Sequence, residues 1–395
     1  MSKIVVLLGA GASMDAGVPD TRGMTAEITN VLETDPQFRR FTFSEVLSFV
    51  VGGVTFRAGA TGGDPFADVD VEEVLNAITL LADRGEIEAL PFISSWHPRV
   101  AELEAEAVDA YSELSQLKLE LSTLLTETLQ HARDSTSSRP PRTEDFVRAL
   151  EAAIRTIARR GSQGIIFREA ADAMFSALTQ IVWLEEAQRV AYLKPLFELS
   201  SRGRLCIATL NYDNAIELAA LSSGLNITDG IEAWSQQGIF APQNNAPFFL
   251  KLHGSIDWYT HEQPQSADRP LARNTPKGGN VNEIRISKLR PAILFGGRQK
   301  LTAEGPFLDL LRAFAQELAE ADGLIVIGYS FRDPHVNEYI SRWINNRPQG
   351  RLVIVDPSFN NSPVQFARRL KGCGDRVQIM AISAREAISQ LPSMQ

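Results

Sequence analysis

The sequence predicts an α/β fold, both from its first strand and from the apolar runs of its C-terminal part. Residues 4–8, IVVLL, are a continuous run of branched apolar side chains, which is typical of a strand buried on both faces of a parallel sheet. From residue 204 short apolar runs alternate with helical segments. These runs are RLCIATLN, FFLKLHG, PAILFGG, GLIVIGYS, RLVIVDP and VQIMAIS. We therefore predict a Rossmann-like parallel sheet with a large helical insertion.

The segment between the first strand and this C-terminal part predicts helices. From Gly23 to Tyr192 apolar residues recur mostly with the 3.6-residue period of a helix. Residues 98–131 predict one long amphipathic helix, which ends before the polar, proline-containing segment 134–142. Packing against other helices is the first interpretation of its apolar face, and contact with another subunit or a partner is the alternative. The expected domains are a sheet-containing core of residues 1–29 and 190–395 and a helical insertion of residues 30–189.

Composition and charge exclude several classes of protein. The 39 Lys and Arg residues against 48 Asp and Glu give a net charge of −9, which argues against direct binding of a nucleic-acid backbone. Two cysteines, Cys206 and Cys373, can form neither a disulfide framework nor a four-thiolate zinc site. The chain shows neither a signal-peptide pattern nor an apolar run approaching about 18 residues. We therefore expect a cytoplasmic protein that does not span a membrane.

A glycine-rich turn, GAGASMDAG, follows the first strand at residues 9–17. Glycine tolerates positive φ and lets backbone N–H groups approach a ligand, and a helix beginning after the turn would point its positive end at an anion. The dinucleotide fingerprint G-x-G-x-x-G is approximate here, because Met14 stands at its third glycine. The turn therefore predicts either a pyrophosphate-binding loop or a tight structural turn.

Polar residues follow several of the other predicted strands. Asn211 and Asp213 come after CIATL, His253 after FFLKL, and Asp356 ends RLVIVD. Open α/β sheets bind ligands where the carboxyl ends of parallel strands meet. There imidazole can accept a proton near neutral pH, and a carboxylate can bind ribose hydroxyls. Each residue also has a structural alternative, which is a turn or cap for Asn211 and Asp356 and a buried hydrogen bond for His253.

Five segments, GAGASMDAGVPDTR, TLNYD, KLHGS, PAILFGG and IGYSF, resemble the motifs of the sirtuins, the silent-information-regulator family, in the same order. The resemblance covers residues 1–25 and much of 204–357 and leaves the helical insertion outside. It implies that NAD is the substrate and that Asn211 and His253 are catalytic, with Asp213 near the nicotinamide carboxamide. The positions that it implies in NAD binding are Gly9, Ala10, Gly11, Ser13, Asp20, Arg22, Asp213, Gly328, Tyr329, Ser330 and Asp356.

The sequence also departs from the protein-deacylating sirtuins. These carry two C-x-x-C pairs in a zinc module after the His-Gly element, whereas residues 255–300 contain no cysteine. LFGG ends in glycine where sirtuins usually have glutamate, Tyr329 replaces a small residue, and Asp356 replaces asparagine. The chain looks more like the sirtuin-like NAD-cleaving effectors of bacterial antiphage systems, and this resemblance implies a site without a metal.

The function implied by this resemblance is an NAD glycohydrolase that releases nicotinamide and ADP-ribose and depletes NAD in antiphage defence. The alternatives are an NAD-dependent protein deacylase or ADP-ribosyltransferase, and a non-catalytic NAD or ADP-ribose sensor. The expected partners are NAD, further copies of the chain and a HerA-like ATPase, while an Argonaute-like protein is less favoured. We expect neither a membrane nor a nucleic acid among them.

Overall fold

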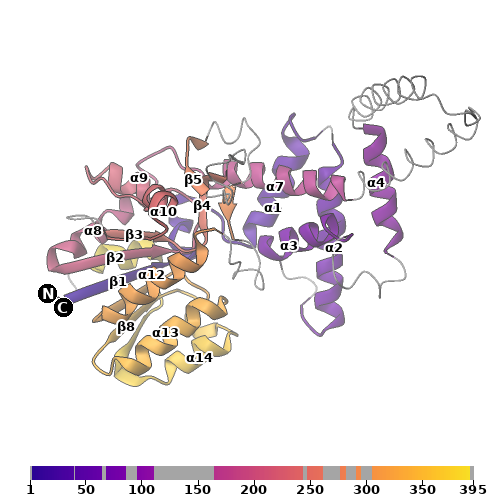
Figure 1. Cartoon of the computed structure of the whole chain (residues 1–395). Helices are drawn as coiled ribbons and strands as arrows, with labels where there is room; N and C mark the ends of the chain where they lie inside the picture. Colours follow the sequence, from indigo (N-terminus) through magenta and orange to yellow (C-terminus); the bar gives the residue numbers. More distant parts are fainter. Residues whose placement is uncertain are drawn as a thin grey trace, which may run out of the picture. The chain divides into compact units, whose positions relative to one another are not determined.

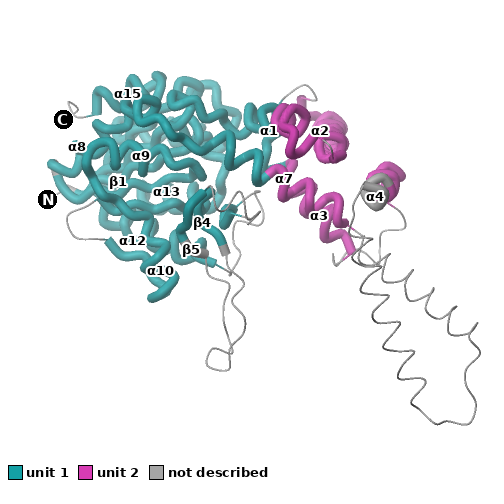
Figure 2. The backbone as a smooth tube through the Cα atoms, turned by 90° about the horizontal axis from the view of Figure 1, so that it is seen from above, with its two compact units in different colours: residues 1–28, 68–73, 175–395 teal, residues 29–67, 74–174 magenta. Residues whose placement is uncertain are grey.

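The computed structural model describes residues 2–39, 41–64, 68–85, 96–110, 164–242, 247–260, 276–281, 291–294 and 305–391. The chain forms two compact units (Figure 2). The core unit comprises residues 1–28, 68–73 and 175–395, and the helical unit comprises residues 29–67 and 74–174. The domain limits expected from the sequence, after residues 29 and 189, stay a prediction.

The core unit is built on a six-stranded parallel sheet with the strand order β3-β2-β1-β7-β8-β9 (Figure 1). Its strands are β1 (Ser2–Leu8), β2 (Gly203–Thr209), β3 (Phe248–Lys251), β7 (Gly323–Ile327), β8 (Arg351–Val355) and β9 (Val377–Met380). On one side of β1 the next strands are β2 and then β3. On its other side they are β7, β8 and β9. The switch point of this topology, where open α/β sheets bind ligands, is therefore the boundary between β1 and β7. The predicted α/β fold with a Rossmann-like sheet is confirmed.

Apolar side chains place β1 at the centre of this sheet. Val5, Val6 and Leu7 are 0% exposed, as the continuous apolar run predicts. β1 pairs with β2 from Ser2↔Gly203 to Leu8↔Thr209, and Leu8 also pairs with Ile327 of β7. The three strands therefore end at the same level, and the residues that follow them meet at one edge.

Helices surround the sheet in the core unit. The longer ones are α12 (Phe307–Glu320) and α13 (Pro334–Asn346). The shorter ones are α8 (Pro195–Glu198), α9 (Ala215–Leu221), α10 (Ile231–Gln237), α14 (Gln365–Lys371) and α15 (Ala384–Gln390). In α12 the buried residues Phe307, Leu310, Phe314 and Leu318 recur every three or four positions, so one face of the helix packs into the core.

The prediction that PAILFGG adds a strand to the parallel sheet is wrong. Its residues Pro291–Ile293 form β6, which pairs antiparallel with β4 (Gly254–Thr260) in a separate sheet that also contains β5 (Pro276–Gly278). The chain leaves the parallel sheet at Gly254, whose φ is +82°. A Cβ at this glycine would lie 2.0 Å from the carbonyl oxygen of Ala292, so only glycine lets β6 approach β4 here.

Within the described residues, five helices confirm the predicted large helical insertion. These are α1 (Gly23–Thr34), α2 (Phe43–Ala60), α3 (Val71–Ala82), α4 (Pro98–Ala110) and α7 (Ile165–Val182). α4 corresponds to the beginning of the long helix predicted over 98–131, whereas residues 111–131 and the segment 134–142 lie outside the described residues. Inside the helical unit, Glu104 pairs with the buried Arg84 and accepts the N–H of Gly164 at 2.6 Å. Among the described helices, none combines the length and the apolar composition that a membrane span requires.

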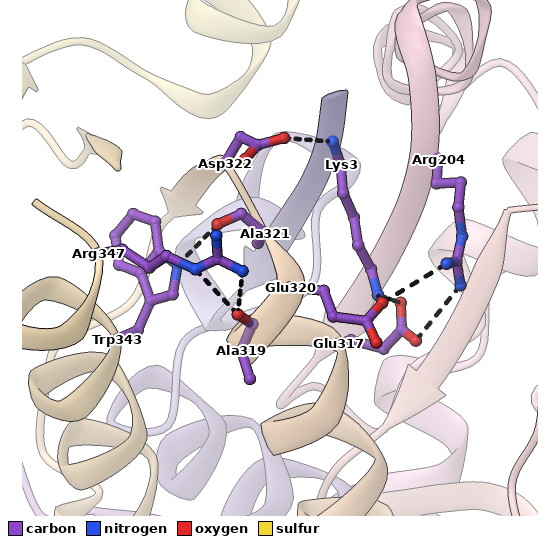
Figure 3. A network of polar contacts seen from close by, with 9 residues as sticks. All are labelled: Lys3, Arg204, Glu317, Ala319, Glu320, Ala321, Asp322, Trp343 and Arg347. Carbon is purple, nitrogen blue, oxygen red and sulfur yellow. Dashed lines mark hydrogen bonds and ion pairs between the residues drawn. The ribbon is translucent and has the colours of Figure 1, made fainter. Parts of the chain in front are cut away.

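Ion pairs anchor the opposite, amino-terminal end of the sheet (Figure 3). The ammonium of Lys3, a residue only 4% exposed, lies 2.9 Å from Glu317 and 2.8 Å from Glu320. The backbone N–H of Lys3 donates to Asp322 at 3.1 Å, and Arg204 lies 3.5 Å from Glu320. These contacts fasten the carboxyl end of α12 to the first residues of β1 and β2, where cations also complement the helix dipole.

Candidate functional site

The glycine turn packs against the end of β7 rather than opening into a helix. After β1 the chain forms two 3-10 turns, Ala10–Ala12 and Met14–Ala16. The N–H of Gly9 donates to the carbonyl of Ile327, and the N–H of Gly11 donates to the carbonyl of Gly328, both at 2.9 Å. Two backbone amides that the sequence predicted as pyrophosphate donors thus donate hydrogen bonds to backbone carbonyls of the protein.

Three glycines allow this close approach of two backbones at the switch point. A Cβ on Gly9 would lie 2.6 Å from the carbonyl oxygen of Gly328, and one on Gly11 would lie 2.8 Å from the Cα of Gly328. Gly328 has a φ of +63°, and its own Cβ would lie 2.3 Å from the nitrogen of Ala12. The glycines are therefore required for packing, and their contact with NAD stays a prediction.

Asn211 joins the glycine turn to the end of β2. Its Nδ2 donates to the carbonyl of Gly9 at 3.0 Å and to the hydroxyl of Ser13 at 2.9 Å. Ser13 accepts from this amide and in turn hydrogen-bonds the carboxylate of Asp213. Four of the predicted site residues, Gly9, Ser13, Asn211 and Asp213, thus form one connected cluster although they come from distant parts of the sequence.

Asp213 is buried beside this cluster, with 6% of its surface exposed. Burial raises the pKa of Asp213, while the N–H of Ala215, at 3.0 Å, and the nearby Lys251 oppose that effect. Lys251, itself 0% exposed, donates to the backbone carbonyl of Asp213 at 2.6 Å and to Glu217 at 2.7 Å. Burial also raises the pKa of Glu217, to about 7.

A small pocket lies at the ends of β1 and β2, against the start of α9. Three of the predicted site residues line it, namely Ser13, Asn211 and Asp213. The rest of its wall consists of Leu8, Ala12, Leu193, Thr209, Ala215, Ile216 and Glu217. The pocket therefore brings the amide and carboxylate of the predicted TLNYD motif together with the glycine turn.

His253 lies one strand further along the same edge and has a buried carboxylate partner. Lys251 pairs with Thr209 in the sheet, so His253 and Asn211 stand at the same level, two residues beyond their strands. The Nε2 of His253 lies 2.9 Å from Oδ2 of Asp333, and the two side chains are only 7% and 4% exposed. Sequence reasoning missed Asp333, because an Asp-Pro pair before a helix is explained by N-capping alone.

Asp333 does cap α13, and further contacts hold it. Its Oδ1 accepts the N–H groups of His335 at 2.9 Å and Val336 at 3.3 Å. Its own N–H donates to the hydroxyl of Tyr329 at 3.2 Å, and that hydroxyl lies 3.0 Å from Asn337 Oδ1. The predicted cofactor residue Tyr329 thus has its side chain buried in this network.

The other predicted residues lie in local turns. Asp20 accepts the N–H of Gly23 at 2.8 Å at the start of α1, and Arg22 is exposed. Asp356 accepts both the N–H and the hydroxyl of Ser358 at 2.7 Å, which is the turn given as its structural alternative. Ser330 is exposed. Asp20 and Asp356 are thus each bound within their own turn.

Comparison with known families identifies part of the chain. Residues 205–374 match the family model of a SIR2-like domain. This part of the chain is therefore similar to a SIR2-like domain. The resemblance to sirtuins that the sequence indicated is thereby confirmed. The matched range contains Asn211, His253 and Asp333, whereas the glycine turn lies before this range and is joined to it through Asn211.

Solved structures similar to this chain are Sir2 proteins. One is a Sir2 homologue in complex with NAD, with 13% identity, coverage of 99% of this chain and 89% of that chain, and a TM-score of 0.40. Another is a Sir2 homologue mutant with ADP-ribose, at 14% identity, 99% and 91% coverage and a TM-score of 0.40. A third, Sir2Tm bound to a propionylated peptide, has 13% identity, 99% and 92% coverage and a TM-score of 0.37. The comparison with curated proteins finds no match.

The cysteine in the matched range that lies within the parallel sheet has no free thiolate to offer. Cys206 is buried inside β2, where burial raises the pKa of its thiol well above the usual value. Among the described residues, no group of three or more His, Cys, Asp or Glu side chains is arranged to hold a metal ion. Most of residues 255–300, where deacylating sirtuins carry their cysteine pairs, lies outside the described residues.

Proposed function

We propose that this protein is an NAD glycohydrolase, which converts NAD and water to nicotinamide, ADP-ribose and a proton. The observation that carries the proposal is the position of Asn211. Its amide is held by Gly9 and Ser13, and it stands level with His253 on the neighbouring strand. An orienting amide and a base at one edge of the sheet are what the reaction needs around a single ribose.

The reaction breaks the bond between the ribose anomeric carbon and the nicotinamide nitrogen through an oxocarbenium-like transition state. Nicotinamide leaves as a neutral molecule, because the bonding electrons neutralise its positive nitrogen, so no general acid is required. Asn211 orients the ribose or the attacking water through its carboxamide oxygen. His253 accepts the proton of that water as the new C–O bond forms, which typically contributes about 10²–10⁴-fold to a rate.

The remaining predicted residues would bind NAD along the switch point. Asp213 would hold the nicotinamide carboxamide in the pocket beside Ser13. The glycine turn, with Ala10 between Gly9 and Gly11, would lie against the pyrophosphate. The adenosine side would reach the ends of β7 and β8, where the expected contacts are Gly328, Tyr329, Ser330 and Asp356, and Asp20 and Arg22 would close over the cofactor.

In the cell we propose a role as a cytoplasmic antiphage effector that depletes NAD when a HerA-like ATPase activates it. The resemblance to sirtuin-like defence effectors supports this role. The helical insertion is the expected site of contacts with further copies of the chain or with the ATPase. The net charge of −9 favours a protein partner over a nucleic acid.

Nicotinamide release measures the proposed function directly. The full chain is incubated with NAD, with and without the ATPase, and nicotinamide and ADP-ribose are quantified by chromatography. Equimolar release of both products is expected. NAD that binds but stays intact under every condition would support the sensor alternative, and NAD consumption that requires an acylated peptide or labels a protein would support the transferase alternatives.

A further inference from the structure

We propose that Asp333 is a positioning residue that fixes the tautomer of His253 and makes its imidazole a stronger base. The inference rests on the proposed function, in which His253 is the base that accepts the proton of water. Asp333 is not among the site residues predicted from the sequence. Its basis is the 2.9 Å contact between His253 Nε2 and Asp333 Oδ2.

Both groups are buried, so water does not compete for this contact. Their side chains are only 7% and 4% exposed. The backbone of His253 is fixed as well, because its carbonyl accepts the N–H of Leu294 at 2.9 Å. A hydrogen bond between an imidazole and a carboxylate in such surroundings is stronger than the same bond at the surface.

The helix that follows Asp333 determines which oxygen faces the imidazole. Oδ1 is used by the first amides of α13, those of His335 and Val336. These donors, together with the positive end of a helix of 13 residues, favour the ionised carboxylate. Oδ2 is therefore held toward His253 as a fixed acceptor.

An ionised carboxylate only accepts hydrogen bonds, so Nε2 of His253 must carry a proton. In the neutral imidazole the lone pair then lies on Nδ1. When water attacks the anomeric carbon, its proton goes to Nδ1, and Asp333 stabilises the resulting imidazolium without taking the proton itself. The proton later returns to solvent, so the step needs no other reactant.

Other titratable groups also surround His253. The ring of Tyr212 lies 6.4 Å from the imidazole, and its hydroxyl donates to Glu72 at 3.0 Å or to the carbonyl of Leu294 at 2.9 Å. Burial raises the pKa of Tyr212 well above its ordinary value, so this ring stays neutral during the reaction. Asp70 lies near Tyr212 and pairs with Arg332 at 3.3 Å. Asp333 is in direct hydrogen-bond contact with the imidazole ring.

Two substitutions remove the carboxylate but keep an N-cap for α13. Asparagine and serine are N-caps about as good as aspartate, so Asp333→Asn and Asp333→Ser both leave an acceptor for the first amides of the helix. Asparagine, in addition, presents an N–H to Nε2 of His253. The imidazole must then carry its proton on Nδ1, which removes the lone pair that the reaction uses. Asp35→Asn is the matched control, because Asp35 caps a turn in the helical unit by accepting the N–H of Gln37.

The first readout does not depend on activity. The full chain is labelled with ¹⁵N-histidine, and the signals of His253 are identified by their loss in His253→Gln. The parent is expected to show a proton on Nε2, and Asp333→Asn a proton on Nδ1. The pKa of the imidazole should fall by about one unit or more in both Asp333 variants, because the carboxylate favours the charged form.

The second readout is nicotinamide release under the condition that activates the parent. Asp333→Asn should lower turnover by about 10²–10⁴-fold while NAD affinity changes only a few-fold, because the pair acts in the transition state. The pH dependence of the residual rate should follow the altered pKa of His253. The control Asp35→Asn should match the parent in both readouts.

The two readouts separate this inference from the proposed function. An unchanged tautomer and titration of His253 in Asp333→Asn would overturn the inference, even if the parent releases nicotinamide and the variant is slow. A parent that never releases nicotinamide would contradict the proposed function, while the change of tautomer would still support the His253–Asp333 pair.

Discussion

Lys251 links Glu217 to the candidate site, because its buried ammonium donates to the backbone carbonyl of Asp213 and to the carboxylate of Glu217. Lys251 is 0% exposed and holds the backbone of Asp213 with one of its hydrogen bonds. Replacing buried polar groups is costly when a partner stays behind without its hydrogen bond. We therefore expect these buried groups to affect the free energy of unfolding.

The free energy of unfolding should depend on pH through Glu217. Burial raises its pKa from 4.5 to about 7. Between these pH values the folded chain keeps a proton that the unfolded chain has lost. This contribution to stability is therefore fully present below about pH 4.5 and is lost as the pH rises through 7, by at most about 3 kcal/mol.

The substitution Glu217→Gln removes this titration. Urea unfolding at several pH values from 5 to 8 should show that the stability of Glu217→Gln, relative to the parent, increases with pH. The exposed Glu198 of α8 provides the control, because Glu198→Gln should track the parent. Parallel curves for Glu217→Gln and the parent would refute the prediction.

At the scale of elements, the glycine turn and the end of β7 pack closely because their glycines have no side chains. Gly328→Ala would place a Cβ 2.3 Å from the nitrogen of Ala12, at a φ of +63°. Gly374 offers a matched control, since its φ is +65° and nothing lies within 4 Å of its Cβ position. Gly374→Ala should cost roughly 1–2 kcal/mol of conformational strain. Gly328→Ala should cost at least about 2 kcal/mol more, because backbone must move, and thermal unfolding of the two variants measures the difference.

The ion pairs at the amino end of the sheet should differ in strength by their burial. In the pair of Lys3 and Glu317 the side chains are 6% and 9% exposed, whereas Arg204 is 58% exposed. Lys3→Met leaves Glu317 buried without its closest cation and should cost about 3 kcal/mol in the free energy of unfolding. Arg204→Met should cost less than about 1 kcal/mol. Equal losses of stability in the two variants would contradict this account of how β1 and α12 are joined.

The same elements explain what could be predicted from the sequence. The run of Val5, Val6 and Leu7 predicted a strand buried on both faces of the sheet, because such burial leaves no polar position. Pro291–Ile293 is equally apolar, yet it pairs antiparallel with β4. Three apolar residues do not encode a pairing direction, and the turn at Gly254 that determines it depends on contacts made only in the fold.

For the whole molecule, the sequence predicted which residues follow the strands, but it did not predict which residues they contact. Parallel strands that end at the same level bring Asn211 and His253 to one edge of the sheet. The pattern of strands in the sequence therefore predicted that the two residues lie at the same edge. The bonding of Gly9 to β7 and of His253 to Asp333 joins residues far apart in the chain. The sequence does not distinguish a glycine that packs against another backbone segment from a glycine that contacts a phosphate. Nor does it distinguish an aspartate that only caps a helix from one that also orients a catalytic base.

The central claim is that Asn211 and His253 act on the ribose of NAD in the transition state. His253→Ala and Asn211→Ala should therefore each lower nicotinamide release by at least about 10²-fold while NAD affinity changes only a few-fold. Nicotinamide release and calorimetric NAD binding are measured for the same preparations of parent and variants, with melting temperature as the check on folding. Full activity in either folded variant, or a loss of binding equal to the loss of rate, would contradict the claim.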